Sequence, residues 1–304
     1  MRTALVRTLG EKLHADSRLT PYLLVDPMLR EPFSKDWLTK VDAETVVVPV
    51  RHPSLKDNQR PLLIRLRSRD APLLEVSVDA ALAEQLDPNA EQDGGFSIGG
   101  WLLSATPQDS LAARLAVCMQ AAAPSSAGRR LVRWVDRRVL EWMWPVLGQG
   151  QRATLFRDID VWFTIDRRNQ LVTYRELGGN AGGKLRLDAR QWAHAQDCQA
   201  VQDLLRGWRR FCPELPIDYL RRAADAVQSI KRLKTIGRQD LVLLGAYVLQ
   251  VHPRLMEHPL LVEAIRRAND GGIPLADVLA EIPDPDGWEM MRADLGWPVS
   301  VSTT

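Results

Sequence analysis

Short runs of apolar residues, many of them β-branched, recur through the first half of the sequence. Runs of this length, bounded by polar and turn-forming residues, are typical of strands. The pattern predicts strands at 22–26, 45–50, 61–66, 101–105 and 131–135, with helices between them. Two further runs, 154–166 and 170–177, meet at Arg167-Arg168-Asn169 and predict a hairpin.

Helical spacing appears between two of these runs and directly after another. Asp109-Ser110 precedes thirteen residues, 111–123, that favour a helix, and Pro124 ends the stretch. After the run at 131–135, apolar residues at 139, 140, 143, 144 and 147 predict a second helix that begins behind Asp136. Strands alternating with helices indicate a layered α/β arrangement.

Beyond residue 187 the pattern is helical. Asp188 and Gln191 have the spacing of a capping box, and helices are expected after this point up to Pro213 and at 217–235, 239–251, 259–269 and 274–280. A chain of 304 residues also exceeds the size at which one core usually keeps growing. We therefore expect an α/β (α+β) lobe with a mixed sheet and flanking helices at 1–187, and an all-α lobe at 188–304.

Composition and charge restrict the class of function. Forty Lys and Arg against 38 Asp and Glu leave a net charge of +2, which gives no strong field toward nucleic acid or anionic lipid. The three cysteines match neither a disulfide framework nor a zinc site. No signal peptide and no run of roughly 20 apolar residues is found. The expectation is a cytoplasmic protein without nucleic-acid or membrane partners.

One short motif would make the chain a hydrolase. Gly95-Phe96-Ser97-Ile98-Gly99 fits the elbow that exposes a nucleophilic serine, and His194, His252 and His258 follow in the required order. An elbow needs a strand before it and a helix after it, whereas polar residues precede this one and a strand-like run follows. The hydrolase stays an alternative, and no catalytic residue is assigned.

A second motif would make it a nucleotide-binding protein. Gly178, Gly183 and Lys184 fit a phosphate-binding loop, but Leu185 stands where Mg²⁺ needs a hydroxyl. The histidines are scattered, and Asp158 and Asp160, expected on one strand face, fit solvated or arginine-paired carboxylates. We expect neither a metal nor a cofactor.

Ten tryptophans outnumber four tyrosines and five phenylalanines. Tryptophan and arginine are favoured anchors at protein interfaces, although core packing is the usual place for each tryptophan. The candidates for partner contact are Trp208, Arg209, Trp288 and Trp297.

The segment LVRWVDRRVLEWMWPVL at 131–147 resembles the LFRFYDPRVL signature of the domain of unknown function 4123 (DUF4123) family. Identical positions are Leu131, Arg133, Asp136, Arg138, Val139 and Leu140, while Trp134 takes the place of a phenylalanine. Val135 and Arg137 depart from the signature, and Arg137 replaces a proline favoured at the first helical position. Asp136 fits an N-cap independently of the resemblance.

Other segments fall in the order of that family, including 22–26, 61–66, 99–105 and 239–265. The resemblance implies a non-catalytic chaperone of a type VI secretion system, which binds one toxic effector and helps load it onto the VgrG spike, often through a PAAR-type domain. Arg133, Trp134, Asp136, Arg138 and Leu140 would then serve structure or binding. The helical lobe would be the candidate effector-binding region.

Overall fold

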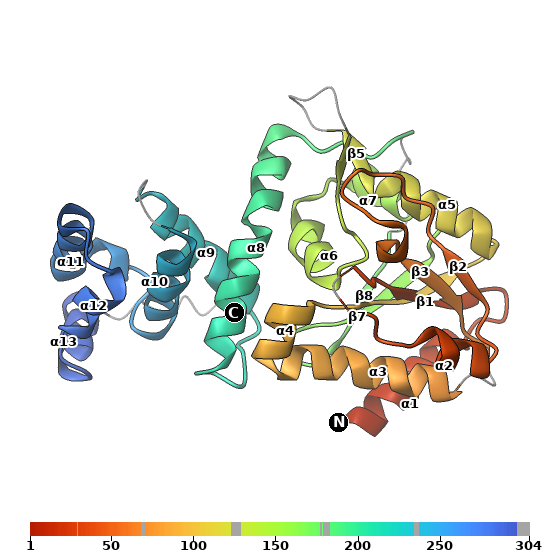
Figure 1. The fold of residues 1–304 in the computed structure, drawn as a ribbon, viewed down its shortest axis with the longest axis horizontal. Coiled ribbons are helices and arrows are strands. Elements are labelled where there is room, and N and C mark those ends of the chain that lie inside the picture. The colour runs from red at the N-terminus through yellow and green to blue at the C-terminus, as the bar shows by residue number, and fades with distance from the viewer. Residues whose placement is uncertain are drawn as a thin grey trace. The chain divides into compact units, whose positions relative to one another are not determined.

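The computed structural model describes residues 1–28, 30–67, 71–122, 129–176, 178, 183–233 and 237–296 (Figure 1). The chain divides into two compact units, Met1–Gln196 and Asp197–Thr304. The predicted lobe boundary after residue 187 lies just before helix α8 (Ala189–Arg209), and the units divide within that helix. No helix in these described ranges is long and apolar enough to cross a membrane.

The first unit contains two sheets and short flanking helices. Its strands are β1 (Thr20–Val25), β2 (Thr45–Val47), β3 (Leu62–Arg65), β4 (Ile98–Ser104), β5 (Gln120–Ala122), β6 (Arg129–Leu131), β7 (Val161–Ile165) and β8 (Leu171–Tyr174). Its helices are α1 (Arg2–Leu13), α2 (Lys35–Lys40), η1 (Asp57–Gln59), α3 (Ala71–Leu86), α4 (Pro88–Gly94), α5 (Gln108–Cys118), α6 (Arg137–Met143), η2 (Trp144–Val146) and α7 (Gln149–Leu155).

The main sheet has the strand order β2-β3-β1-β4-β7-β8. Neighbouring strands are antiparallel in every described pair, so the predicted mixed sheet is corrected to an antiparallel one. Figure 1 shows α1 and α3 on one side of the sheet and α5, α6 and α7 on the other. Because both faces are covered, β4 and β7 are buried at every residue.

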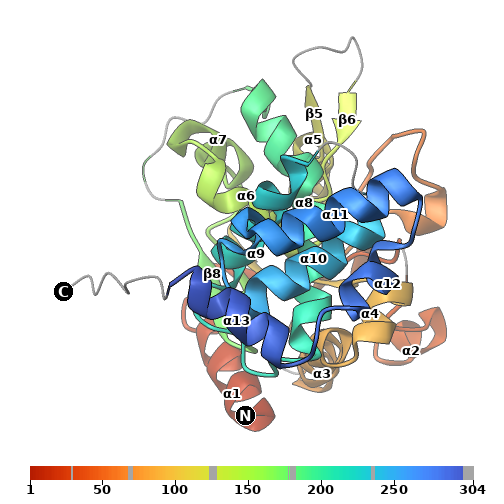
Figure 2. The same cartoon turned by 90° about the vertical axis from the view of Figure 1, so that its left-hand side faces the viewer.

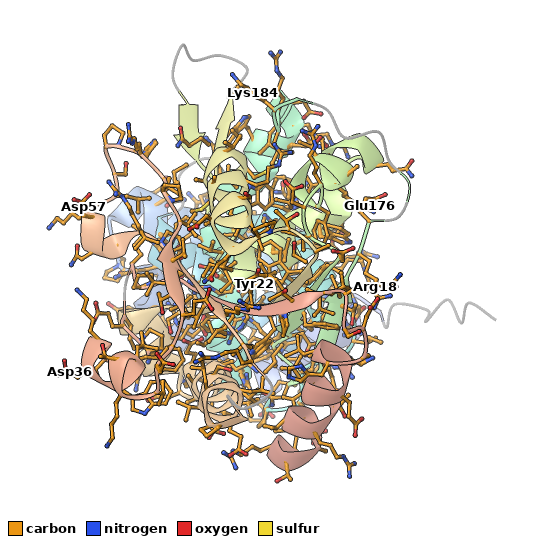
Figure 3. All side chains as sticks on the ribbon, turned by 90° about the vertical axis from the view of Figure 1, so that its right-hand side faces the viewer. Arg18, Tyr22, Asp36, Asp57, Glu176 and Lys184 are labelled. Carbon is orange, nitrogen blue, oxygen red and sulfur yellow. The ribbon has the colours of Figure 1, made fainter. Side chains whose placement is uncertain are left out.

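One face of the sheet forms a continuous core with α1 and α3. Leucines at helical spacing on α1, Leu5, Leu9 and Leu13, pack with alternate strand residues such as Trp101 and Phe163. Tyr22, labelled in Figure 3, lies on the opposite face of β1 and is also buried. Its hydroxyl donates to the carbonyl of Thr106 at 3.2 Å. Side chains on both faces of β1 are therefore buried, and neither face of the strand is exposed to solvent.

Three predicted elements end differently from the pattern. The predicted helix 111–123 stops at Cys118, because Gln120–Ala122 pairs as β5 with β6, which overrides the helical propensity of its alanines. The predicted strand 131–135 ends at Leu131, and a turn leads to α6. The predicted strand 154–166 begins only at Val161, because Thr154 and Leu155 belong to α7, so Asp158 and Asp160 precede β7 rather than lying on it.

The hairpin and the capping box are confirmed. β7 and β8 pair through a turn in which Asn169 adopts a left-handed conformation, with φ 60°. At the start of α8 the Asp188 carboxylate accepts from the Gln191 amide at 2.8 Å, and the Gln191 side chain accepts from the Asp188 amide at 3.0 Å. These two bonds satisfy backbone donors that a helix start leaves free.

The second unit is all-helical, as the pattern predicts. It contains α8 (Ala189–Arg209, which begins in the first unit), α9 (Tyr219–Lys231), α10 (Arg238–Gln250), η3 (Leu255–Glu257), α11 (Pro259–Gly271), α12 (Leu275–Ala280) and α13 (Asp286–Asp294). Buried residues on α11, namely Leu261, Ala264, Ile265 and Ala268, recur at helical spacing and form its inner face.

Candidate functional site

The segment that resembles the family signature lies between β6 and α6. Asp136 caps α6, because its Oδ1 accepts from the backbone N–H of Arg138 at 3.0 Å. The same carboxylate also accepts from the Arg138 guanidinium, at 3.0 Å from Nε and 2.8 Å from a terminal nitrogen. Trp134 and Leu140 are fully buried, and the Trp134 indole N–H donates to the carbonyl of Cys118 at 3.0 Å.

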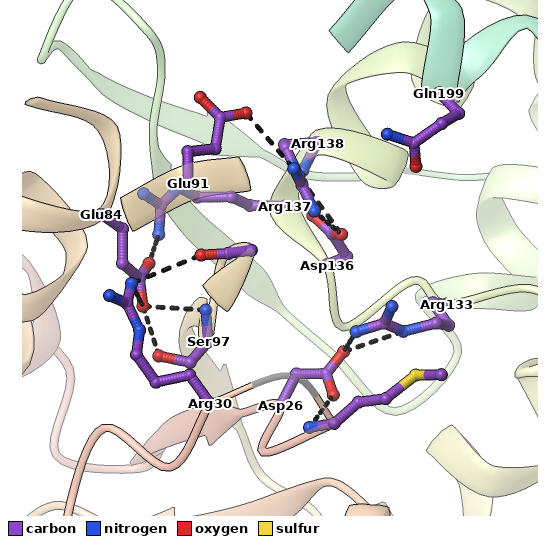
Figure 4. A network of polar contacts seen from close by, with 12 residues as sticks. Asp26, Arg30, Glu84, Glu91, Ser97, Arg133, Asp136, Arg137, Arg138 and Gln199 are labelled. Carbon is purple, nitrogen blue, oxygen red and sulfur yellow. Dashed lines mark hydrogen bonds and ion pairs between the residues drawn. The ribbon is translucent and has the colours of Figure 1, made fainter. Parts of the chain in front are cut away.

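Four buried carboxylates face arginines around this segment (Figure 4). We call the carboxylates and these arginines together the signature network. Asp26, just after β1, accepts from Arg133 at 3.1 Å. Glu84 on α3 accepts from Arg137 at 2.9 Å. The members are Asp26, Glu84, Glu91 and Asp136 with Arg133, Arg137, Arg138 and Arg167.

Glu91 on α4 joins the signature segment to the hairpin turn. It accepts from Arg167, at 3.0 and 2.6 Å from the two terminal nitrogens, and from Arg138 at 3.3 Å. The Phe96 ring lies beside the guanidinium carbons of Arg137, Arg138 and Arg167, at 4.1, 4.7 and 5.4 Å. An aromatic face stabilises cations at such distances, so Phe96 helps to hold three positive charges together.

Burial and neighbouring charge shift the acidity of these groups in opposite directions. Burial raises the pKa of Asp26, and the positive charge of Arg133 only partly offsets this effect. Burial also opposes ionisation of Asp136, but the charge and hydrogen bonds of Arg138 outweigh it and lower the pKa of Asp136. Burial lowers the pKa of Arg137, with Glu84 acting against the shift. The Glu84 carboxylate also lies 3.6 Å from a terminal nitrogen of Arg30, which is partly exposed.

The chemistry of this network is that of a structural clamp. Each carboxylate is engaged by a guanidinium, and the contacts connect β1, α3, α4, α6 and the hairpin turn. Among the described residues no group of three or more His, Cys, Asp and Glu side chains could hold a metal ion. Sequence reasoning identified Arg133, Asp136 and Arg138 but missed Glu84, Glu91 and Arg167.

Replacing Asp136 by asparagine tests this arrangement through its pH dependence. Asparagine keeps the cap but loses the charge-assisted bonds to Arg138, so the free energy of unfolding should fall by about 1.5–3 kcal/mol near neutral pH. Because the pKa of Asp136 is lowered from 3.8, its stabilisation is complete above that value and disappears as pH falls through the folded-state pKa. In urea unfolding, the gap between wild type and Asp136→Asn should therefore narrow on acidification. A gap that is constant or widens would contradict the assignment.

The serine of the elbow motif occupies a different local structure. Ser97 lies after helix α4 and before strand β4, the reverse of the required order. It is buried, its hydroxyl donates to Glu84, and its amide donates to the same carboxylate at 2.8 Å. The ring of His194 stacks on Trp142 at 3.9 Å. Ser97 thus supports the position of Glu84.

The glycine-rich loop lies largely outside the described residues, which include only Gly178 and Gly183 of its glycines. Lys184 is exposed at the periphery (Figure 3), and Leu185 and Leu187 behind it are buried. Helix α8 begins only at Ala189, so Lys184 does not stand at a helix N-terminus as in a phosphate-binding loop.

The candidate anchors in the helical unit are mostly inside it. Trp208 and Trp288 are 5% and 7% exposed, and Trp288 stacks on Tyr247 with ring centroids 4.2 Å apart. Arg209 is half-buried, and Trp297 lies outside the described residues. Their role as partner contacts stays a prediction.

Comparison with known proteins gives one match. Residues 21–154 match the family model described as "Domain of unknown function (DUF4123)". This range contains all four carboxylates of the signature network, and Arg167 lies beyond it. No curated protein and no solved structure matches the chain.

Proposed function

Because residues 21–154 form a DUF4123 domain, we propose that this chain is an adaptor of a type VI secretion system. It would bind a cognate toxic effector in the cytoplasm and promote its loading onto the VgrG spike or an associated PAAR-type domain, without catalysing a reaction. The observation that carries the proposal is the family match, whose last part contains the signature segment with the charged residues that hold the fold together.

The arrangement of the first unit supports this role over the two enzymatic alternatives. Ser97 is engaged by Glu84 inside the protein, so it does not present a nucleophile at a turn. Leu185, in the position where a phosphate-binding loop carries a metal-binding hydroxyl, is buried and apolar.

Co-purification tests the adaptor directly. The tagged chain, expressed with a candidate toxin and its VgrG, should retain the toxin on affinity resin, and deletion of its gene should abolish secretion of that toxin alone. A second toxin from another spike cluster in the same cells is the matched control. The proposal fails if neither the toxin nor the spike is retained. It also fails if the purified protein shows esterase turnover lost in Ser97→Ala, or ATP binding lost in Lys184→Ala.

A further inference from the structure

A surface groove of about 240 Å³ lies between helices α11, α12 and α13 in the second unit. Its apolar lining includes Leu260 and Ala264 on α11, Val278 on α12, Ile282, and Met290 on α13. Leu260 and Met290 are 49% and 46% exposed, so they form its accessible walls. Figure 2 looks onto these three helices.

The floor of the groove is fixed, while part of its wall is adaptable. Ala264, Val278 and Met291 are buried, and Gly287 brings the start of α13 against Ile282, where an added Cβ would lie 2.8 Å from Cγ2. Methionine side chains adapt to differently shaped apolar partners. The volume is below the ~300–1,000 Å³ of typical small-molecule sites, which favours a few inserted side chains over a whole ligand.

The surroundings of the groove are strongly acidic. Residues 255–296 contain nine Asp or Glu against three Arg, a formal net charge of −6 in a chain whose total is +2. Arg267 pairs with Glu281 at 2.9 Å, and Arg266 pairs with Glu263 and Asp270. Arg292 donates to the carbonyls of Val251 and Gln250. The three arginines of this segment are thus already engaged.

Three acidic residues belong to the segment 283–290 that supplies Pro283, Gly287 and Met290 to the groove. Asp284, Asp286 and Glu289 are exposed, and the described residues place no Lys or Arg in an ion pair with them. The lining itself adds two acidic side chains, Glu263 and Glu281, against one arginine, Arg267. A mainly apolar groove in an acidic segment selects an apolar partner surface bordered by positive charge.

We propose that this groove binds an amphipathic helix of a protein partner, with apolar residues at helical spacing and lysine or arginine beside them. Helix-in-groove recognition uses such anchors three and four residues apart. Resting on the proposed function, the helix belongs to the cognate effector. The binding itself depends only on the groove and its acidic segment.

The probe is a fluorescent 14-residue peptide of leucine and lysine with leucines on one helical face, and its leucine and glutamate counterpart is the charge control. The wild-type protein should bind the leucine–lysine peptide, with an affinity that falls as the salt concentration rises, and should not bind the leucine–glutamate peptide. Leu260→Asn with Met290→Gln should weaken binding about tenfold or more, since both are exposed anchors of the groove wall. Val262→Asn is the matched control: it is 48% exposed on the same helix but does not line the groove.

The same variants separate this inference from the adaptor function when tested with the toxin. Loss of toxin retention in the Leu260/Met290 variant alone supports both proposals. If the groove variant and the wild type bind the peptide equally, the groove is not the binding site and the inference is wrong. Groove-dependent peptide binding without any retained toxin or spike overturns the adaptor function and keeps the groove. Thermal unfolding of each variant confirms that the unit is folded.

Discussion

Replacing Arg137 by methionine should lower the free energy of unfolding by about 3–5 kcal/mol, the usual effect of breaking a buried ion pair from one side. The Arg137 guanidinium is 3% exposed and donates to Glu84 at 2.9 Å and to the carbonyls of Ile98 and Ala81 at 2.8 and 2.7 Å. Methionine preserves much of the side-chain volume but leaves the Glu84 carboxylate buried without its closest cation. Urea unfolding monitored by tryptophan fluorescence would measure the loss.

A second substitution distinguishes lost charge pairing from lost packing. Glu84→Gln keeps an oxygen that can accept from the amides of Ser97 and Ile98, now 2.8 and 3.2 Å from Glu84 Oε1. It removes the buried charge that Arg137→Met leaves with only the partly exposed Arg30, 3.6 Å away. The double variant with Arg137→Met should therefore be more stable than Arg137→Met alone. If the two losses simply add, the pair is not coupled and the clamp is misassigned.

The matched control for this series is Arg2→Met. Arg2 pairs with Asp79 on the exposed surface, where solvent screens the interaction, so its replacement should leave stability nearly unchanged. A loss comparable with that of Arg137→Met would point to a general effect of removing an arginine.

Arg137 also shows what the sequence could and could not reveal about the site. In the family signature this position is a proline, so Arg137 looks like a departure that weakens the start of α6. The structure places Arg137 at the centre of the network, 53 residues from its partner Glu84. Asp136 could be predicted because a cap is a local interaction. The pairs Asp26–Arg133 and Glu91–Arg167, separated by 107 and 76 residues, leave no such local signal.

The helices, strands and turns show the same difference between features set by neighbouring residues and features set by distant ones. The α8 capping box and the left-handed Asn169 turn follow from residues within a few positions of each other. Residues 119–123 carry helix-forming alanines, yet three positions in this stretch pair with Arg129–Leu131. A signal for Glu84 did exist: a carboxylate within the apolar stretch ALAEQL requires a buried partner.

Strand β4 contains two glycines, Gly99 and Gly100, at which a side chain would overlap neighbouring atoms. A substitution at Gly100 is therefore expected to have the second large effect on stability. Gly100 has φ +131°, and an added Cβ would overlap the carbonyl oxygen of Phe163 and lie 2.7 Å from Trp162 Nε1. The Trp162 indole donates to the carbonyl of Gly99 at 3.1 Å, so it is held over this part of the strand. Beside it, a Cβ on Gly99 would overlap the carbonyl oxygen of Val135 in the signature segment.

Gly100→Ala should therefore destabilise the protein by about 2–6 kcal/mol, combining overpacking with backbone strain at a positive φ. The nearest obstructing atom, the carbonyl oxygen of Phe163, belongs to the backbone, so no change of rotamer removes it. Strand β4 would have to move away from β7 at the centre of the sheet. Soluble yield and urea unfolding would measure this. Gly207→Ala is the control: on α8 its added Cβ meets only Val242, at 3.7 Å, and alanine should stabilise the helix by about 0.5–1 kcal/mol. A Gly100→Ala protein as stable as wild type would show that β4 and β7 do not approach as closely as described.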